Sequence, residues 1–413
     1  MIIMKFIEDV EYEKYEKFVV SNNKSHFLQS HAWGEFAREC KKMQPYYLGL
    51  EDNKGNLVAT CLLLQKKLPL GFSYFYAPRG YVIDFKDFNL VSEFTNHIKD
   101  FVKNKNGIYF KIDPDIKLHT IDKDAKEIPG ENNKDVVKHL ESIGFKHLPL
   151  TYYFESEQPR FTFRIDLNGK SIDEVHNNYS KTANRFVKKS KDFAINVSVG
   201  DEDDIKDFSN LMILTEQRQN FYSHNEEYYR CFYKHFSKRG NVNIMTAKID
   251  IDKTIEMLNK KIEEIRDSEN VNEVTLKNKM EELDFFKNKK SLNNKLISSY
   301  YTVFYGNKAW YLYGANDMDY KMTYANYKLF NYQIEKALEK NVQIFDEFGT
   351  VGIPTSTKKV AGLHEFKKKF GGEYTEFVGE FDYPTKKVLY FFFTKLVNIR
   401  RRIIKLKNRK SVK

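Results

Sequence analysis

The chain has 413 residues, of which 41% are hydrophobic and 15% aromatic. This is enough for two or three packed domains and argues against extensive disorder. The net charge of +11 favours a polyanionic partner, namely nucleic acid, an anionic bilayer or a pyrophosphate-bearing substrate. A codon bias that inflates the lysine count explains the same charge equally well.

The sequence predicts neither a membrane span nor a disulfide framework. No apolar run approaches the roughly 18 residues that cross a bilayer, and no signal peptide is recognisable at the N-terminus. The three cysteines, Cys40, Cys61 and Cys231, lie far apart, which favours a reducing, cytoplasmic setting. Cys61 falls in an apolar run, so we expect it in a core.

The first half of the chain alternates strand and helix patterns. Turn residues separate the apolar runs, and apolar residues recur at helical spacing after the third run. We expect strands at 45–50, 57–68 and 72–76, a helix at 87–104, a strand at 107–112 and a helix at 134–142.

The second half repeats this order without evident sequence identity. The pattern predicts strands at 242–248, 296–305 and 309–313, a helix at 321–340 and a strand at 342–346. We therefore expect a mixed α/β fold with two similar lobes, at 1–158 and 159–381. By analogy, N-acetyltransferase folds have this element order.

A segment at 250–294 interrupts the second lobe. It contains neither proline nor glycine, and its apolar residues recur in steps of three and four. This spacing predicts two antiparallel helices that form a coiled-coil arm. The arm is either a solvated spacer or a surface for a partner.

The C-terminal segment, 382–413, is basic, because no acidic residue follows Asp382. It is also amphipathic, because apolar residues are interspersed with the basic ones. Three interpretations stay open for the predicted helix. It rests on anionic lipid headgroups, contacts a nucleic-acid backbone, or packs on the first lobe.

Several common chemistries have no support in the sequence. There is no phosphate-binding G-x-x-x-x-G-K-[ST] loop, no dinucleotide fingerprint, no nucleophile elbow and no H-E-x-x-H motif. The ten histidines show no metal-ligand spacing. We therefore predict neither a metal nor another cofactor.

An ordered set of short segments carries a family resemblance. The segments are LQSHAWG at 28–34, YAPRG at 76–80, YFKIDP at 109–114, NYSKTANRFVKKS at 178–190, DEFGTVG at 346–352 and GLHEFKKKFGG at 362–372. Together they resemble the FemABX family, whose members transfer amino acids from aminoacyl-tRNA to peptidoglycan side branches. In FemA-like members a helical arm, similar to that of seryl-tRNA synthetases, stands where 250–294 lies here, so the resemblance implies that this arm faces tRNA.

The resemblance implies two catalytic residues. Lys367 would stabilise the developing oxyanion or a phosphate of the tRNA end, and Asp113 would orient or deprotonate the acceptor amine. Each has a structural alternative: lysines 367–369 form a solvated stripe, and Asp113 caps a strand.

The substrate-binding residues are implied in the same way. Arg185 and Lys181 would contact the acceptor's pyrophosphate, or else form a solvated helix face. The remaining candidates are Arg79, which otherwise pins a loop; Phe366, beside Lys367 in the transfer channel; and Tyr313 and Trp33, which otherwise only pack.

We therefore predict transfer of Gly, Ser or Ala from aminoacyl-tRNA to the peptide branch of a lipid II-type precursor. The ester is already activated, so the enzyme needs only to align the reactants, move one proton and stabilise an oxyanion. We expect a cytoplasmic protein with peripheral contact to an anionic membrane at its inner face. The alternatives are an acetyl-CoA-dependent N-acetyltransferase, whose [RQ]-x-x-G-x-[GA] turn is absent, and a basic RNA-binding protein.

Overall fold

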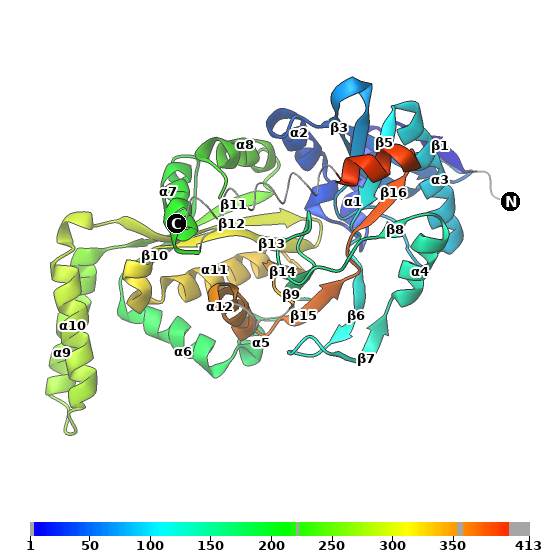
Figure 1. The fold of residues 1–413 in the computed structure, drawn as a ribbon. Coiled ribbons are helices and arrows are strands. Elements are labelled where there is room, and N and C mark those ends of the chain that lie inside the picture. The colour runs from blue at the N-terminus through cyan, green and yellow to red at the C-terminus, as the bar shows by residue number, and fades with distance from the viewer. Residues whose placement is uncertain (1–3, 220–222, 353–357, 396–413) are drawn as a thin grey trace. The chain divides into compact units, whose positions relative to one another are not determined.

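The computed structural model describes residues 4–219, 223–352 and 358–395, and it divides into two compact units (Figure 1). The first unit holds the residues up to Arg160 and those from Glu376 onward, and the second runs from Phe161 to Thr375. The predicted second lobe extended to residue 381. In the structure the second unit ends at Thr375, and the strand that begins at Phe381 pairs within the sheet of the first unit.

The first unit is built on one mixed sheet with helices on both faces. The sheet order is β1 (Lys5–Ile7), β2 (Gln44–Glu51), β3 (Leu57–Lys67), β4 (Ser73–Ala77), β5 (Gly107–Ile112), β16 (Phe381–Pro384) and β8 (Lys146–His147). The other elements are α1 (Tyr12–Ser21), α2 (His31–Cys40), α3 (Phe88–Asn104), α4 (Lys134–Ser142) and the hairpin of β6 (Lys117–Ile121) and β7 (Glu127–Asn132).

Helix α3 forms where the sequence predicts it, for local reasons. The Asp87 side chain caps its N-terminus by accepting from the N–H of Leu90. The face of α3 that includes Phe94 and Ile98 is buried against the sheet. Because α3 crosses from β4 to β5, these two strands run parallel and end at the same edge. Cys61 on β3 is fully buried, which confirms its predicted place in the core.

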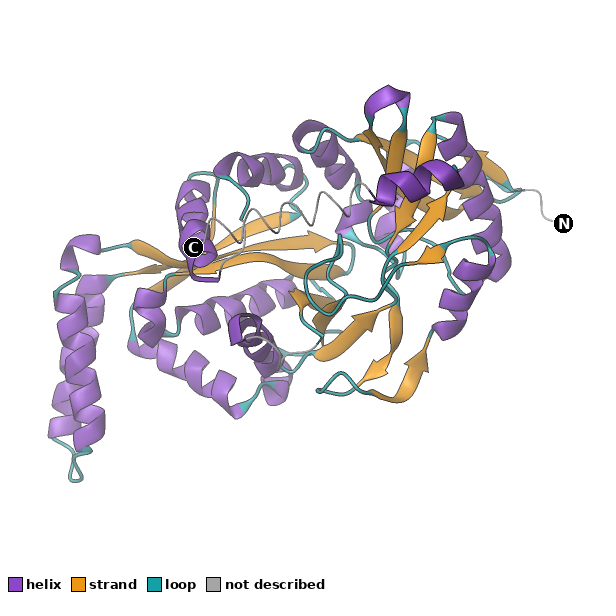
Figure 2. Cartoon of the chain, in the orientation of Figure 1, coloured by secondary structure: helices purple, strands orange, loops and turns teal. Residues whose placement is uncertain are grey.

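The second unit repeats this plan on a sheet of its own, with helices on both faces (Figure 2). Its strand order is β10 (Ile195–Gly200), β11 (Val242–Ile249), β12 (Lys295–Tyr305), β13 (Lys308–Asn316), β14 (Ile344–Thr350), β9 (Phe161–Asp166) and β15 (Glu373–Phe377). The helices are α5 (Ile172–Asn178), α6 (Lys181–Lys189), α7 (Asp204–Gln219), α8 (Glu226–Ser237), α11 (Ala325–Glu339) and α12 (Lys358–Lys367), besides those of the arm.

Helix α11 connects β13 to β14, which again run parallel. The predicted helix began at residue 321, but α11 begins at Ala325. The chain first makes a 3-10 turn, Met318–Thr323, and Tyr324 then adopts a left-handed conformation with φ of 54°. Apolar periodicity does not record such a turn, so the predicted boundary was four residues early.

The strands β13 and β14 pair only over three residues, from Lys308–Ile344 to Trp310–Asp346. Beyond this point a register shift in β13 sets Tyr301 opposite Tyr313 and Thr302 opposite Tyr311. The extra residue moves the side chains that follow it to the opposite face of the sheet. Tyr311 therefore packs on Phe330 of α11, whereas Tyr313 lies among aromatic rings of α8.

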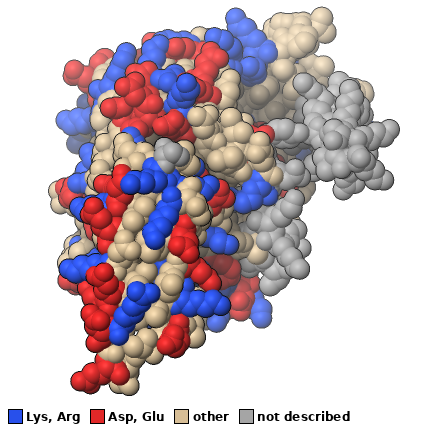
Figure 3. Space-filling model, turned by 90° about the vertical axis from the view of Figure 1, so that its left-hand side faces the viewer, with Lys and Arg blue, Asp and Glu red and all other residues tan. Residues whose placement is uncertain are grey.

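The arm consists of α9 (Ile251–Arg266) and α10 (Glu273–Lys287), which lie side by side and antiparallel (Figure 1). Leu258 and Ile262 of α9 and Leu283 and Phe286 of α10 are buried in the same cluster. The two helices carry seven basic and eight acidic residues. The face of the molecule with the arm accordingly shows both signs of charge intermixed (Figure 3).

The C-terminal segment is described only as far as residue 395, and the rest of the predicted 382–413 helix lies outside the described residues. Residues 387–395 are helical. Leu389 and Phe393 pack against Ile108 and Tyr109, and the Tyr390 hydroxyl donates to Asp382, 2.9 Å away. This part of the segment thus packs on the first unit.

Candidate active site

The first unit brings Asp113 and Arg79 together where β4 and β5 end. Asp113 follows β5 directly, and its two carboxylate oxygens accept from the N–H of Arg79 at 2.6 Å and the hydroxyl of Tyr76 at 2.8 Å. Arg79 holds a left-handed φ of 53°, which turns its N–H towards the carboxylate. Because the strands are parallel neighbours, their carboxyl ends meet at one edge, the usual place of a ligand site in such sheets.

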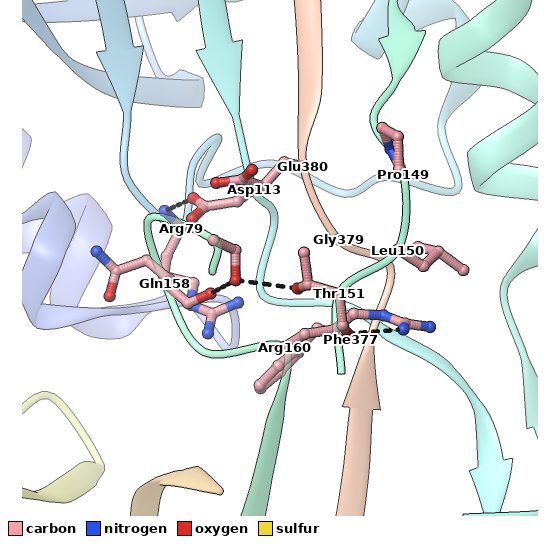
Figure 4. A pocket seen from close by; sticks show the side chains of 11 residues that line it. Arg79, Asp113, Pro149, Leu150, Thr151, Gln158, Arg160, Phe377, Gly379 and Glu380 are labelled. Carbon is pink, nitrogen blue, oxygen red and sulfur yellow. Dashed lines mark hydrogen bonds between the residues drawn. The ribbon is translucent and has the colours of Figure 1, made fainter. Parts of the chain in front are cut away.

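A small cavity adjoins this pair (Figure 4). The segment 149–160 covers it, and Arg79 is tied to that segment by a 2.6 Å hydrogen bond from Nη2 to the carbonyl of Pro159. Arg160 forms an ion pair with Glu376 and donates to the carbonyl of Thr151. The cavity volume is about 10 Å³, which is room for about one water molecule.

Burial raises the pKa of Asp113 to about 7, and the nearby charge of Glu380 adds to the increase. The charge and the N–H of Arg79 act in the opposite direction. Figure 4 shows Glu380 beside Asp113 at the same side of the cavity. A carboxyl with this pKa is half ionised near neutral pH, as a general base in this range requires.

The second unit buries Lys367 at the end of α12. Its ammonium donates to the carbonyl oxygens of Glu347 at 2.5 Å, Gly349 at 2.7 Å and Phe348 at 3.2 Å. The residue is 4% exposed, so a solvated stripe does not describe it. Burial lowers the pKa of Lys367 to about 8, while the acidic groups of Glu347 and Asp346 oppose that shift.

Glu347 is a second buried acid that the sequence analysis missed. It is fully buried, and among the described residues neither carboxylate oxygen has a hydrogen-bond partner. Burial raises the pKa of the Glu347 carboxyl well above its usual range, and the charge of Lys367 acts against this. The neighbouring Asp346 is instead satisfied by Arg164 and Thr162. Two successive acids in a short apolar strand were the available indication.

Helix α6 presents Lys181 and Arg185 to solvent, together with Lys188 and Lys189. Ser180 caps the helix by accepting from the N–H of Ala183. No acidic residue lies in α6, so all the charges on its exposed side are positive.

Three further candidates lie in aromatic packing. Trp33 packs against Phe27 and Phe36 and does not line the Asp113 cavity. The hydroxyl of Tyr313 lies 2.9 Å from that of Tyr228.

Phe366 packs against Tyr327, Phe330 and Phe370 beside Lys367. Arg160 and Glu380, which line the Asp113 cavity, were not predicted, because nothing in their local sequence separates them from surface charges. Among the described residues, neither unit by itself brings three metal-ligating side chains within reach of one ion.

Each unit repeats one α/β plan, the first with a buried carboxyl where its parallel strands end and the second with a buried ammonium. The FemAB family model matches residues 10–397, so the chain belongs to the FemAB family. This confirms the resemblance drawn from the ordered motifs, and it makes the chain an aminoacyltransferase-type enzyme rather than an RNA-binding scaffold.

Similar proteins include a lipid II:glycine glycyltransferase of Staphylococcus epidermidis, 26% identical over 93% of this chain and 94% of the relative. The aminoacyltransferase FemA of the same species is 26% identical over 96% of this chain and all of its own length. The crystal structure of FemX has a TM-score of 0.77 at 22% identity, covering 94% of this chain and 99% of that one, which shows the shared fold.

Proposed function

We propose that this enzyme transfers an amino acid from aminoacyl-tRNA to an amine in the peptide branch of a lipid II-type precursor. The lipid II:glycine glycyltransferases among the relatives support the precursor, because their name gives lipid II as the acceptor. The observation that carries the proposal is Asp113, a buried carboxyl with a pKa of about 7 in a cavity at the strand ends. Glycine, serine and alanine are the candidate amino acids.

In the proposed reaction the acceptor amine attacks the ester carbonyl and a C–N bond forms. The proton of the amine passes to Asp113. The tetrahedral intermediate then collapses, the ester C–O bond breaks, and the ribose hydroxyl of the tRNA leaves with a proton. Asp113 gives its proton to the leaving oxygen and so returns to its ionised form. No cofactor is consumed.

Lys367 is proposed to supply positive charge to the oxyanion or to a phosphate of the tRNA end. Its N–H groups are already directed at the carbonyls of Glu347, Phe348 and Gly349. When the substrate binds, the ammonium would therefore release one of these carbonyl oxygens and donate that hydrogen bond to the substrate. Its pKa of about 8 keeps most of the group charged at pH 7.

The acceptor must open the first unit's cavity. A volume of about 10 Å³ does not admit a peptide, so we propose that the segment 149–160 moves away from Asp113 when the acceptor binds. This segment exposes three large apolar side chains, Leu150, Tyr152 and Phe154, which are available to a peptide or lipid substrate.

The location proposed for the enzyme is the cytoplasmic face of the membrane that holds the precursor. None of the helices within the described ranges is long and apolar enough to cross a bilayer. On the helix 387–395, Val388 is 69%, Phe391 52% and Phe392 58% exposed. The chain after Asp382 carries eleven basic residues and no acidic one. Exposed apolar rings beside basic residues fit an anionic lipid surface.

The test is a transfer assay with purified lipid II and tRNA charged with radiolabelled glycine, serine or alanine. We expect labelled lipid II with one of the three amino acids and none when uncharged tRNA and free amino acid replace the ester. Absence of product with all three would overturn the proposed function. A parallel assay with acetyl-CoA tests the N-acetyltransferase alternative.

A further inference from the structure

The second unit contains a second, larger cavity that the proposed chemistry does not use. It lies where the 3-10 turn Met318–Thr323 enters α11, and its volume is about 460 Å³. Small-molecule sites span roughly 300–1,000 Å³, so this cavity has the size of a ligand site.

Flat aromatic rings make up much of the wall. Phe186 of α6 stacks on Tyr324 with ring centroids 4.3 Å apart and planes 15° apart, and it meets Tyr327 edge-on at 5.0 Å. Tyr320 also lines the cavity. It is buried, and its hydroxyl has no hydrogen-bond partner among the residues that the structure describes. These groups offer a stacking surface and an unused polar group to a planar ligand.

The polar part of the wall favours an anionic or neutral ligand over a cation. Lys321, Asn316 and Asn326 line the cavity. The acid in the wall, Asp317, is neutralised by Lys295 at 2.7 Å.

The basic side of α6 continues from this cavity. Phe186 is a wall residue, and the guanidinium of its neighbour Arg185 lies 5.0 Å from the Phe186 ring. Lys181, Lys188 and Lys189 extend the exposed positive charge along the same helix. An aromatic cavity bordered by a row of cations is the arrangement that binds a base and its phosphate backbone. The arm, by contrast, has balanced charge.

We propose that this cavity binds the terminal nucleotide of the aminoacyl-tRNA, with the base against the ring of Phe186 and the preceding phosphates on α6. The inference rests on the proposed function and adds to it a binding surface for the donor. It also gives the cations of α6 a nucleic-acid ligand, whereas the family resemblance implied that they bind the pyrophosphate of the acceptor.

The experiment measures binding of the trinucleotide CCA, adenosine monophosphate and inorganic pyrophosphate to the full chain by titration calorimetry. Phe186→Leu keeps an apolar side chain of similar size but removes the stacking face. Phe186→Tyr keeps the ring. Phe88→Leu is the matched control, because Phe88 is also half-buried on a helix but lies in the first unit.

We expect CCA to bind the wild type and Phe186→Leu to weaken it about tenfold, the loss of one base stack. Phe186→Tyr and Phe88→Leu should stay within about twofold of wild type. Lys188→Gln should lower the salt dependence of CCA binding by about 0.7 in the log–log slope, the value for one phosphate contact to a single strand. Thermal melting of each variant checks that it is folded.

Two results would overturn the proposal. One is CCA affinity that does not change in Phe186→Leu. The other is pyrophosphate competing with CCA as strongly as adenosine monophosphate does, which would assign α6 to the diphosphate of the lipid precursor. The transfer assay separates the two proposals. If the wild type transfers the label while Phe186→Leu binds CCA normally, only the cavity assignment fails. If Phe186→Leu loses CCA binding while the wild type transfers nothing, only the proposed reaction fails.

Discussion

The ammonium of Lys367 donates a 2.5 Å hydrogen bond to the backbone carbonyl of Glu347, whose own carboxylate is fully buried without a hydrogen-bond partner among the described residues. The two side chains thus share a dry interior in which each ionised form is costly. Burial lowers the pKa of Lys367 to about 8 and raises that of Glu347 well above its usual range. The stability of the fold should therefore depend on pH and on the presence of both side chains.

Loss of Lys367 should destabilise the fold in a pH-dependent way. In Lys367→Met, Glu347 keeps its proton in the folded state to a higher pH than in the unfolded state. Stability should therefore fall as pH rises above the unfolded value of about 4.5. We expect a loss of about 3–5 kcal/mol in urea unfolding at pH 7. The double variant Lys367→Met/Glu347→Gln should lose the added pH slope, and an unchanged slope would contradict the assignment.

Asp113 should control the acidic limb of activity. Because its pKa is about 7 and the ionised form accepts the proton, kcat/KM should fall tenfold per unit as pH decreases below about 7. Asp113→Asn should lower kcat by about 10²- to 10⁴-fold and flatten that limb. Asp135→Asn is the matched control, because Asp135 is an exposed carboxylate paired with Lys86 in the same unit. A full acidic limb in Asp113→Asn would show that another group takes the proton.

Gly362 and Gly371 of the 362–372 motif should respond in opposite directions to alanine. Gly371 has a φ of 75°, and a Cβ there would lie 2.2 Å from the carbonyl oxygen of Asn178. Gly371→Ala should therefore destabilise the protein by more than about 1 kcal/mol. Gly362 lies within α12 with no atom near its Cβ position, so Gly362→Ala should be neutral or stabilising by up to about 1 kcal/mol. Urea denaturation of both variants measures the contrast, and equal effects would contradict it.

The base of the arm should be part of the core of the second unit. Phe286 is fully buried and contacts Tyr320 and Phe193, so Phe286→Ala should cost about 3–5 kcal/mol. Met280 on the same helix is 42% exposed, and Met280→Ala should cost less than about 1 kcal/mol. If Phe286→Ala unfolds with the wild-type midpoint, the arm is an independent appendage.

The exposed rings of the C-terminal helix should mediate vesicle binding. We expect co-sedimentation with vesicles containing phosphatidylglycerol and little with phosphatidylcholine alone, since each basic residue near an anionic surface contributes about 1 kcal/mol. Phe391→Ser/Phe392→Ser should release the protein from the anionic vesicles. Tyr12→Ser, another exposed aromatic of the first unit, serves as control. Equal binding to both vesicle types would contradict the proposed contact with an anionic membrane.

The sequence by itself determined the order of the strands and helices with clear periodicity, the repeated plan and the family. Strand and helix periodicities are local, and the caps that support them, such as Asp87 before α3, lie within a few residues. The motif order is likewise a property of the chain alone. These features need no knowledge of which distant residues meet.

Only the tertiary structure decided the chemical state of the site. Lys367 stands among three successive lysines, and its burial depends on the carbonyls of a distant strand. The pKa of Asp113 is set by burial, Arg79 and Glu380, the last of which is far away in sequence. The shift in β13 separates Tyr311 from Tyr313, which strict alternation would place on one face. Desolvation and register are properties of packing between distant segments, so local patterns do not encode them.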